Sequence, residues 1–565
     1  MMHNTTSPEM TANVFDYFED VPMTDGARAP WAARTPRRPQ KGYDMKLTAR
    51  SPDWESDAAS LAALQRIESE PWVEETVRDG GGVLLRLADS WIEMAGAALE
   101  AGGRAEAQLA DLARGQSFSV QFWDPNATKA LHVGHLRNLA IGNALAAALK
   151  QAGGHVERRS RISDTGRAMG EAMAGVMQSG RHGQGWSEVD QKSDHFVGVC
   201  YAGYVAGDGS ELPSAGELEP AEDSLSREVH VQNDAADELI KRVLAGDGEA
   251  VELWSRTRAW VIAGQRKTLA RLGIAFDRVL FESDFLQETT ELAQDGLRSG
   301  VLTRRADGVV VYETGLKELE EMPLVRADGL STQHLRSLTY ALHAPALEDF
   351  SSLQVTGSEW IAHVTSIRKL ASELRPELNG DFHPSRSIFH GMVSQRKRAL
   401  TSSAGALLVD ELADWVDAQI DGDRARRAVR RAHPNPERIA AQVVLGYFLP
   451  HPIAPDVEFD LSRLLGDEES LGWDLARARA HRSRDARRGG RVVEDPDYRF
   501  AVVQSELYRR HLRLAVQRLD LQPLTHYLKH LSIWYLESER SEPVERVVHT
   551  LLDRSARGLG LEVAQ

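Results

Sequence analysis

The stretch from residue 117 to residue 162 constrains the fold more than any other part of the chain. Apolar and polar residues alternate over 117–123, which predicts a strand, and an Asp-Pro-Asn turn ends it. Apolar residues at helical spacing predict a helix over 134–151, and a strand pattern returns at 156–162. This order predicts a βαβ unit within a parallel, nucleotide-binding type of sheet, and therefore an α/β fold.

The rest of the pattern divides the chain into four parts. Its 565 residues exceed what one hydrophobic core supports, so about three or four domains are expected. Residues 1–45 lack apolar periodicity, which predicts a mobile tail, and 46–115 predict a small N-terminal α/β domain. We expect a Rossmann-like α/β domain with insertions over 116–412, including helix over 233–272. Residues 413–565 predict a helical bundle.

Composition limits the partners and the location. The net charge of −16 argues against a protein that coats nucleic acid indiscriminately, although arginine is concentrated at 424–431 and 477–491. No apolar run approaches the roughly 20 residues of a membrane span, and the first residues lack a signal-peptide pattern. A cytoplasmic protein without a membrane partner is expected. Because Cys200 is the only cysteine, we expect no disulfide within the chain and no protein-bound metal at a cysteine site.

The chemistry is indicated by the sequence DPNATKALHVGHLR at 124–137. His132 and His135 lie where a loop enters a helix, and a helix N-terminus offers unpaired N–H groups and a positive dipole end to a phosphate. Imidazole donors there can stabilise charge on a phosphoryl group during in-line attack. Gly134 has no Cβ, so a flat adenine ring could approach the backbone. The alternative, two surface histidines, is disfavoured by the flanking strand and helix.

The pattern PN-x5-HVGHLR resembles the signature of the arginyl-tRNA synthetase family, class I enzymes that form an aminoacyl-adenylate and transfer the aminoacyl group to tRNA. Four later features resemble the same family in the same order: 163–166, 192–198, 281–283 and the helices after 436. Residues 82–91 resemble the end of its N-terminal domain. The resemblance implies a class I synthetase catalytic core, a C-terminal anticodon-binding-like bundle and a monomer. It also implies ATP, supplied with Mg²⁺ as the substrate complex, an amino acid and tRNA as partners.

The second phosphate-binding loop of such enzymes is altered here. Its usual sequence is Lys-Met-Ser-Lys-Ser, and the signature lysine corresponds to Ala399. Arg396, Lys397 and Arg398 precede it and could reach a pyrophosphate, although three basic loop residues are more often solvated. Some family members that lack the loop lysine carry one shortly before the two histidines. Lys129 has that place, so the resemblance implies that Lys129 acts together with His132 and His135 in catalysis.

The amino-acid pocket departs further from the family. A bound arginine needs carboxylate or carbonyl partners for its guanidinium. Asn126 matches a family residue that contacts the substrate, and Glu282 matches a family acid. The tyrosine and aspartate of the family's Tyr-x-x-Arg-Asp segment correspond to Gln333 and Ser337, and a family glutamine corresponds to Trp360. These changes indicate a changed substrate. Glu359 or Asp328 could alternatively replace the lost acid.

Three functions follow from these observations. The first is a divergent synthetase that charges tRNA, nominally with arginine. The second is a paralogue in specialised metabolism that activates another amino acid for amide or ester formation, and the third is an inactive tRNA-binding module. If 477–491 is one continuous helix, a single face carries four arginines suited to a tRNA backbone: Arg477, Arg484, Arg488 and Arg491. A solvated, salt-bridged helix is the alternative. We favour an active, ATP-dependent enzyme, because the residues of the first motif are retained together.

Overall fold

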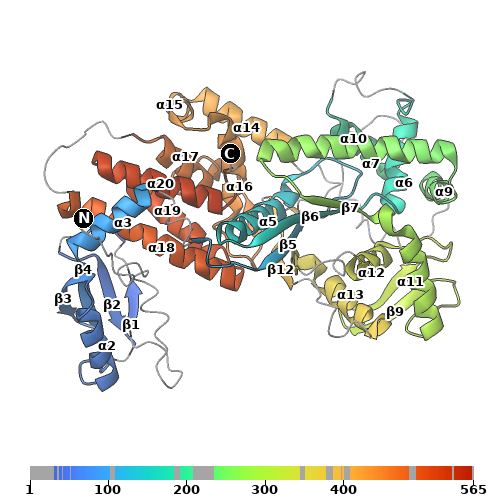
Figure 1. Cartoon of the computed structure of the whole chain (residues 1–565). Coiled ribbons are helices and arrows are strands. Elements are labelled where there is room, and N and C mark those ends of the chain that lie inside the picture. The colour runs from blue at the N-terminus through green and yellow to red at the C-terminus, as the bar shows by residue number, and fades with distance from the viewer. Residues whose placement is uncertain are drawn as a thin grey trace, which may run out of the picture.

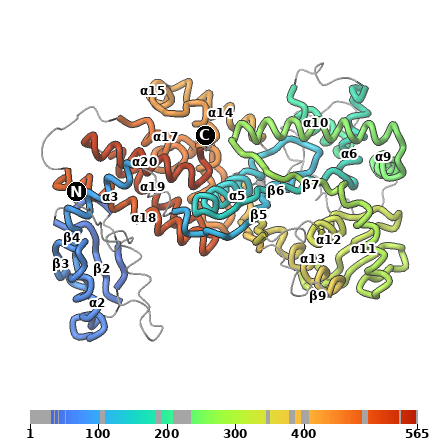
Figure 2. The backbone as a smooth tube through the Cα atoms, viewed as in Figure 1, coloured from blue at the N-terminus to red at the C-terminus, as the bar shows by residue number. Residues whose placement is uncertain are grey.

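A computed structural model of the chain describes residues 31–34, 37–40, 42–50, 52–101, 109–183, 191–207, 234–343, 350–376, 386–395, 398–399, 407–482, 492–537 and 540–562. The molecule is elongated (Figure 1). Figure 2 shows the N-terminal unit at one end and the region of α9 to α13 at the other, with α5 between them. In the described part of the chain, no helix has both the length and the apolar character needed to cross a bilayer.

The central sheet has five parallel strands in the order β12-β11-β5-β6-β7. The strands are β5 Ser117–Trp123, β6 His155–Ile162, β7 Arg278–Phe281, β11 Ser351–Gly357 and β12 Arg386–His390. Helix α5 Val133–Gln151 connects β5 to β6, which confirms the predicted βαβ unit and the parallel sheet. Most of α5 is buried, because the sheet covers one side and α16 and α20 contact it from the other.

Between β6 and β7, the described residues form the helices α6 Arg167–Gln178, α7 Ser193–Ala206, α9 Ala235–Leu244 and α10 Gly248–Leu272. The helix predicted over 233–272 is thus two helices. Gly246 adopts a positive φ of 77°, and the Asp247 side chain accepts a hydrogen bond from the Ala250 N–H and so begins α10. A glycine followed by an aspartate is a strong local break, and it outweighs the apolar periodicity on either side.

A second, smaller core follows β7. It contains the antiparallel strands β8 Thr303–Arg304, β9 Val310–Leu316 and β10 Leu319–Val325, in the order β10-β9-β8. The helices around them are η3 Glu282–Phe285, α11 Leu286–Ser299, α12 Gln333–His343, η4 Ser358–Trp360 and α13 Ile361–Leu374. Buried apolar residues of α11, α12, α13 and the hairpin form one cluster. This packing fixes α12 beside η3, and the two elements carry most of the predicted amino-acid pocket.

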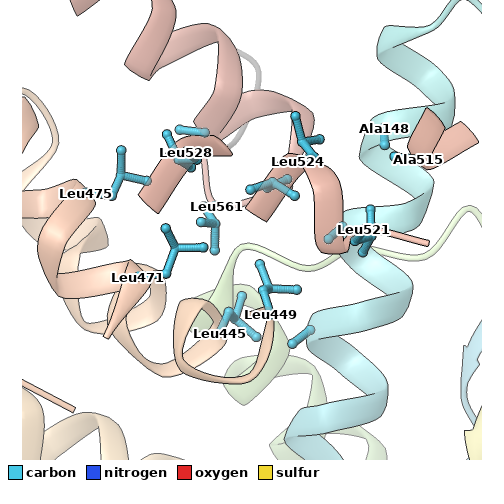
Figure 3. Packing of buried hydrophobic residues seen from close by; sticks show 14 of the residues in the cluster. Ala148, Leu445, Leu449, Leu471, Leu475, Ala515, Leu521, Leu524, Leu528 and Leu561 are labelled. Carbon is cyan, nitrogen blue, oxygen red and sulfur yellow. The ribbon is translucent and has the colours of Figure 1, made fainter. Parts of the chain in front are cut away.

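The C-terminal part is mainly helical: α14 Val409–Gly422, α15 Arg424–Ala432, η6 Pro436–Arg438, α16 Ile439–Phe448, η7 Leu461–Arg463, α17 Leu471–Ala480, η8 Val492–Glu494, α18 Pro496–Arg518, α19 Gln522–Leu536 and α20 Glu542–Gly558. A small sheet, β14 Arg398–Ala399, β13 Val393–Gln395 and β15 Val457–Phe459, joins it to the central domain. Figure 3 shows the leucine core of this bundle, with Ala148 of α5 beside Ala515 of α18. The bundle and α5 therefore share one core.

The N-terminal unit begins earlier than predicted. Strand β1 Trp31–Arg34 pairs with β2 Met45–Ala49 in an antiparallel sheet of order β1-β2-β4-β3. Its other elements are α2 Ala58–Glu68, β3 Val73–Asp79, β4 Gly82–Leu87 and α3 Asp89–Ala101. The Trp31 ring is buried against Trp54. The prediction of a mobile tail over 1–45 is therefore wrong at 31–34, since a four-residue strand is too short to show periodicity. Residues 1–30 lie outside the described residues.

Two further predictions in the C-terminal half need correction. The expected domain boundary between residues 412 and 413 falls inside α14, which begins at Val409. The helix containing Arg477 ends at Ala480, where His481 takes an extended backbone with ψ 134°, so 477–491 is not one continuous helix. Arg477 forms an ion pair with Asp467 at 2.7 Å. Arg484, Arg488 and Arg491 lie outside the described residues, and the shared arginine face has no support.

Candidate active site

The two histidines of the signature form the N-terminus of α5. His132 is the N-cap, and its Nδ1 accepts a hydrogen bond from the Gly134 N–H at 3.2 Å. The backbone N–H of His132 donates in turn to His135 Nδ1 at 3.1 Å. The ring centroids are 3.9 Å apart. Each ring thus completes a reciprocal cap that serine and glutamate usually form, so the loop and the rings hold each other in place.

This arrangement fixes the protonation of both rings. Because each Nδ1 accepts a backbone N–H, the proton of each neutral imidazole is on Nε2. Burial lowers the pKa of His135 to about 3, and it lowers the pKa of His132 well below its usual value. The charge of Lys129 contributes to both shifts. At neutral pH the site therefore presents two Nε2–H donors beside the N–H groups of a helix N-terminus, which suits a phosphate.

Hydrogen bonds from helix α10 fix the backbone of the loop that carries Lys129. Gln265 is buried, and its Nε2 donates to the Lys129 carbonyl at 2.8 Å and to the Asn126 carbonyl at 3.3 Å. The Lys129 ammonium lies 5.9 Å from the centre of the Tyr201 ring, a cation–π distance. The structure thus brings Lys129 to the same loop end as both histidines, as the sequence predicts.

The second phosphate loop leads directly into the first motif. Leu408 forms an antiparallel bridge with His132. The Val133 N–H donates to the Leu407 carbonyl at 2.9 Å, and the Val409 N–H donates to the Leu131 carbonyl at 3.0 Å. Arg396 and Lys397 lie outside the described residues, and for Arg398 only the backbone, in β14, is described. The chain that follows this loop is therefore fixed to the histidine motif, although the loop's basic side chains are not placed.

Arg137, the last residue of the signature, has a structural role. It is fully buried, and its guanidinium donates to the carbonyls of Gly391, Pro452, Ile453 and Pro455 at 2.6 to 3.0 Å. Burial lowers its pKa to about 10. The arginine fastens α5 to the segments on either side of β13 and β15, so the signature stabilises the junction with the bundle as well as the phosphate site.

Glu282 lies at the centre of the predicted amino-acid pocket. It is 2% exposed, and its Oε2 accepts from Ser163 Oγ at 2.8 Å and from Arg336 Nε at 2.7 Å. Its Oε1 is buried and has no hydrogen-bond partner among the described residues. Asn126 forms a parallel bridge with Ser163, which places Asn126 beside this carboxylate. Three predicted or neighbouring residues therefore meet at the carboxyl ends of β5 and β6, where ligands bind in parallel sheets.

Ser337 occupies a different electrostatic environment from the one an aspartate would create. Its Oγ accepts a hydrogen bond from Arg161 Nη1 at 3.1 Å. The Arg161 guanidinium also lies 5.2 Å from the centre of the Tyr340 ring, and the Tyr340 hydroxyl donates to Gln121 at 2.6 Å. Sequence reasoning missed Arg161. Side chains two residues apart on a strand share a face. The position of Arg161 two residues before Ser163 could therefore have indicated that both side chains face the same site.

The remaining predicted pocket residues are Trp360 on η4 and Gln333 on α12. The Trp360 ring packs edge-on against His363 at 5.2 Å. His363 Nδ1 is 2.8 Å from His334 Nδ1, and burial lowers the pKa of His334 to about 4. Gln333 begins α12, one turn before Ser337. A pair of buried neutral histidines beside a tryptophan gives this side of the pocket little charge.

The two acids considered as substitutes for the missing aspartate differ in their surroundings. Asp328 accepts from Arg326 at 3.1 Å and from Lys241 at 3.0 Å, so it is already paired with two cations. The Glu359 carboxylate lies next to Gly357, and its residue is exposed. Asp328 would have to break two ion pairs before it could meet a guanidinium beside Ser337.

The chain is similar in sequence to known proteins. Residues 104–342 match the family profile described as tRNA synthetases class I (R), catalytic domain. Arginine–tRNA ligases of Amoebophilus asiaticus and Bacteroides fragilis are 28% and 27% identical over 348 and 293 residues, which cover 59% and 51% of the chain. The matches cover 56% and 48% of those relatives, so the chain spans about half the length of the curated relatives it matches.

Solved structures show the same fold over the whole chain. The Thermus thermophilus arginyl-tRNA synthetase has a TM-score of 0.60 at 20% identity, with 95% of each chain covered. The Plasmodium falciparum arginyl-tRNA synthetase has a TM-score of 0.57 at 12% identity, with 94% of each covered. These likenesses show that the chain has the fold of those synthetase structures, which confirms the predicted fold class. The sequence likeness to arginyl-tRNA synthetases is centred on the catalytic domain, at 28% identity or less among the relatives named above.

Proposed function

We propose that the chain activates an amino acid as its adenylate, using ATP, and transfers the aminoacyl group to tRNA. The observation that supports this most is the pair of neutral histidines at the N-terminus of α5, with both Nδ1 atoms engaged by the backbone. ATP enters as its Mg²⁺ complex, because three phosphates need a counter-charge beyond one lysine. The family relation supports the same activity.

In the proposed step, a carboxylate oxygen of the amino acid attacks the α-phosphorus of ATP. A new phosphorus–oxygen bond forms while the bond to the bridging oxygen breaks, and pyrophosphate leaves with that electron pair. Negative charge moves onto the phosphate oxygens, and the Nε2–H groups of His132 and His135 donate to them. Lys129 carries a mobile charge that can follow the departing pyrophosphate.

The acceptor is proposed to be tRNA because the helical bundle packs directly on the catalytic domain. Asn143 of α5 donates to the Gly560 carbonyl at 2.8 Å, and Gln151 donates to the Arg554 carbonyl at 3.0 Å. Helix α15 has no buried residue and carries five arginines in nine positions. An exposed arginine helix on this bundle suits a phosphate backbone. Arginine is the amino acid that the family likeness suggests as substrate. The residues around Ser337 favour a different amino acid.

ATP–pyrophosphate exchange tests the adenylation step directly. The wild-type chain should exchange labelled pyrophosphate into ATP in the presence of one amino acid of a complete panel, and His132→Ala should lose most of that rate. His155→Ala is a matched control, because His155 is an exposed residue at the start of β6. Exchange at the wild-type rate in His132→Ala would show that the site is misassigned.

A further inference from the structure

The amino-acid pocket contains an arginine whose charge is not matched by the protein. Burial of a guanidinium usually requires a carboxylate, and the neighbouring arginines follow this rule: Arg159 pairs with Glu157, and Arg336 with Glu282. Among the residues that the structure describes, no carboxylate lies within ion-pair distance of the Arg161 guanidinium. Its one side-chain hydrogen bond there goes to the neutral Ser337 hydroxyl. Most of its N–H donors therefore remain available to a ligand.

The position of Arg161 is fixed from three sides. Its backbone N–H donates to Asp124 Oδ1 at 3.2 Å, and its guanidinium lies over the Tyr340 ring. The other carboxylate oxygen of Asp124 accepts from Gln121, and Gln121 also accepts from Tyr340. Asp124 therefore holds the strand end without reaching the guanidinium. A fork held over an aromatic ring is preorganised for a planar, bidentate partner.

A complementary group lies on the same strand face. Ser163, two residues after Arg161, hydrogen-bonds to Glu282 Oε2, while Glu282 Oε1 is buried without a partner among the described residues. The site thus contains one set of unmatched donors, on the half-buried Arg161, and one unmatched, buried acceptor, on Glu282. An arginine substrate would bring a second guanidinium next to Arg161, and like charges in a partly buried site repel.

We propose that Arg161 is a specificity-determining residue that binds the side-chain carboxylate of an acidic amino acid, while Glu282 accepts an N–H of the same molecule. This rests on the proposed function, because the α-carboxylate must face ATP at His132 and His135. The carboxylate that reaches Arg161 is then the one on the side chain. Charge-assisted, bidentate pairing with a guanidinium is geometrically suited to carboxylates.

The test combines binding with activity. Calorimetry on the full chain with ATP present would measure aspartate, glutamate, their amides and arginine, and pyrophosphate exchange would be run on the same panel. An acid should bind at least tenfold more tightly than its amide and than arginine. Arg161→Ala should weaken its binding about 100-fold, while Arg161→Lys should lose less, since it keeps the charge but not the fork.

Two further variants make the outcome decisive. Ser337→Asp should also abolish acid binding, because the introduced carboxylate would pair with Arg161, and this change does not remove the arginine that packs on Tyr340. Arg278→Ala, on the adjacent strand with a partly exposed side chain, should bind the acid as the wild type does. Preferred binding of arginine, no binding of any acid, or an Arg161→Ala variant that still binds the acid normally would each overturn the proposal. Acid binding without pyrophosphate exchange would instead contradict the proposed adenylation and leave the assignment of Arg161 standing.

Discussion

The predicted phosphate site and the predicted amino-acid pocket lie at the same edge of one parallel sheet, yet they depart from the family's pattern to different extents. The phosphate site depends on a helix N-terminus, two ring nitrogens and a nearby lysine, all within seven residues of sequence. The pocket is assembled from β6, η3, α12 and η4, which are far apart in the chain. A site built from one local segment keeps its geometry wherever the segment folds. In a site built from several elements, two or three substitutions can change the net charge of the side chains that line it while the fold persists.

The largest effect is expected at Lys129. Lys129→Ala should reduce pyrophosphate exchange by about 10³-fold or more, since no signature lysine remains in the second loop to follow the leaving pyrophosphate. Lys150→Ala, at the exposed far end of α5, serves as the control. Lys397→Ala should be milder. If Lys397→Ala were instead the more damaging change, the second loop would retain the phosphate chemistry.

His132→Ala and His135→Ala should each lower the exchange rate by roughly 10²–10³-fold, or about 2–4 kcal/mol of transition-state stabilisation. ATP binding, measured by equilibrium dialysis, should weaken far less, because the rings act on charge that develops during the reaction. Their Nε2–H groups are already neutral donors, so the exchange rate should not fall through imidazole protonation between pH 8 and pH 6. A steep fall in that window would mean that a protonated histidine is required.

Restoring the family's pocket residues should raise the rate of arginine activation. Arg161, which contacts Ser337, should limit that increase. Ser337→Asp with Gln333→Tyr and Trp360→Gln adds a carboxylate that Arg161 will pair with. Adding Arg161→Ser to these three changes frees that carboxylate for the substrate. We expect arginine kcat/KM to rise by roughly 10²-fold in the fourfold variant, and by much less in the threefold one. Equal activities of the two variants in exchange assays would show that Arg161 does not compete.

Low pH should lower the free energy of unfolding, because the folded chain contains histidines that are buried as neutral rings. Burial lowers the pKa of His334 and of His390 from 6.5 to about 4. Below pH 6.5 the unfolded chain binds more protons than the folded one, so stability present at neutral pH is lost as pH falls toward 4. Each ring accounts for about 2 kcal/mol by pH 5. Urea unfolding at pH 7.5 and pH 5 measures this loss, and equal midpoints would contradict it.

The smallest effect concerns tRNA. Replacing Arg424, Arg427 and Arg431 of α15 by glutamine should reduce the salt dependence of tRNA binding by about 2 to 3 in log–log slope, because fewer counterions are released. The same substitution of Arg484, Arg488 and Arg491 tests the segment first predicted. A filter-binding titration at several salt concentrations distinguishes them, since only the set that contacts tRNA should flatten the slope. If neither set alters it, or if the wild type does not bind, tRNA is not the acceptor.

Sequence periodicity alone determined the central βαβ unit, the parallel sheet and the helical character of the C-terminal part. These features are local: alternation and helical spacing are read over one element, and the capping histidines lie three residues apart. The helix break at Gly246 and the short strand β1 were missed because each depends on a few residues rather than on a repeated pattern.

Only the tertiary structure shows which charged groups meet in the predicted pocket. Arg161 and Ser337 are 176 positions apart, and Glu282 and Arg336 are 54 apart, so no local pattern indicates either contact. Only packing of α12 against η3 and β6 shows that the position of the missing acid faces a cation. Arg137 likewise reads as part of a catalytic signature, whereas its four carbonyl contacts lie more than 250 residues away. Charge matching depends on distances in space, which the fold sets and the order of residues does not.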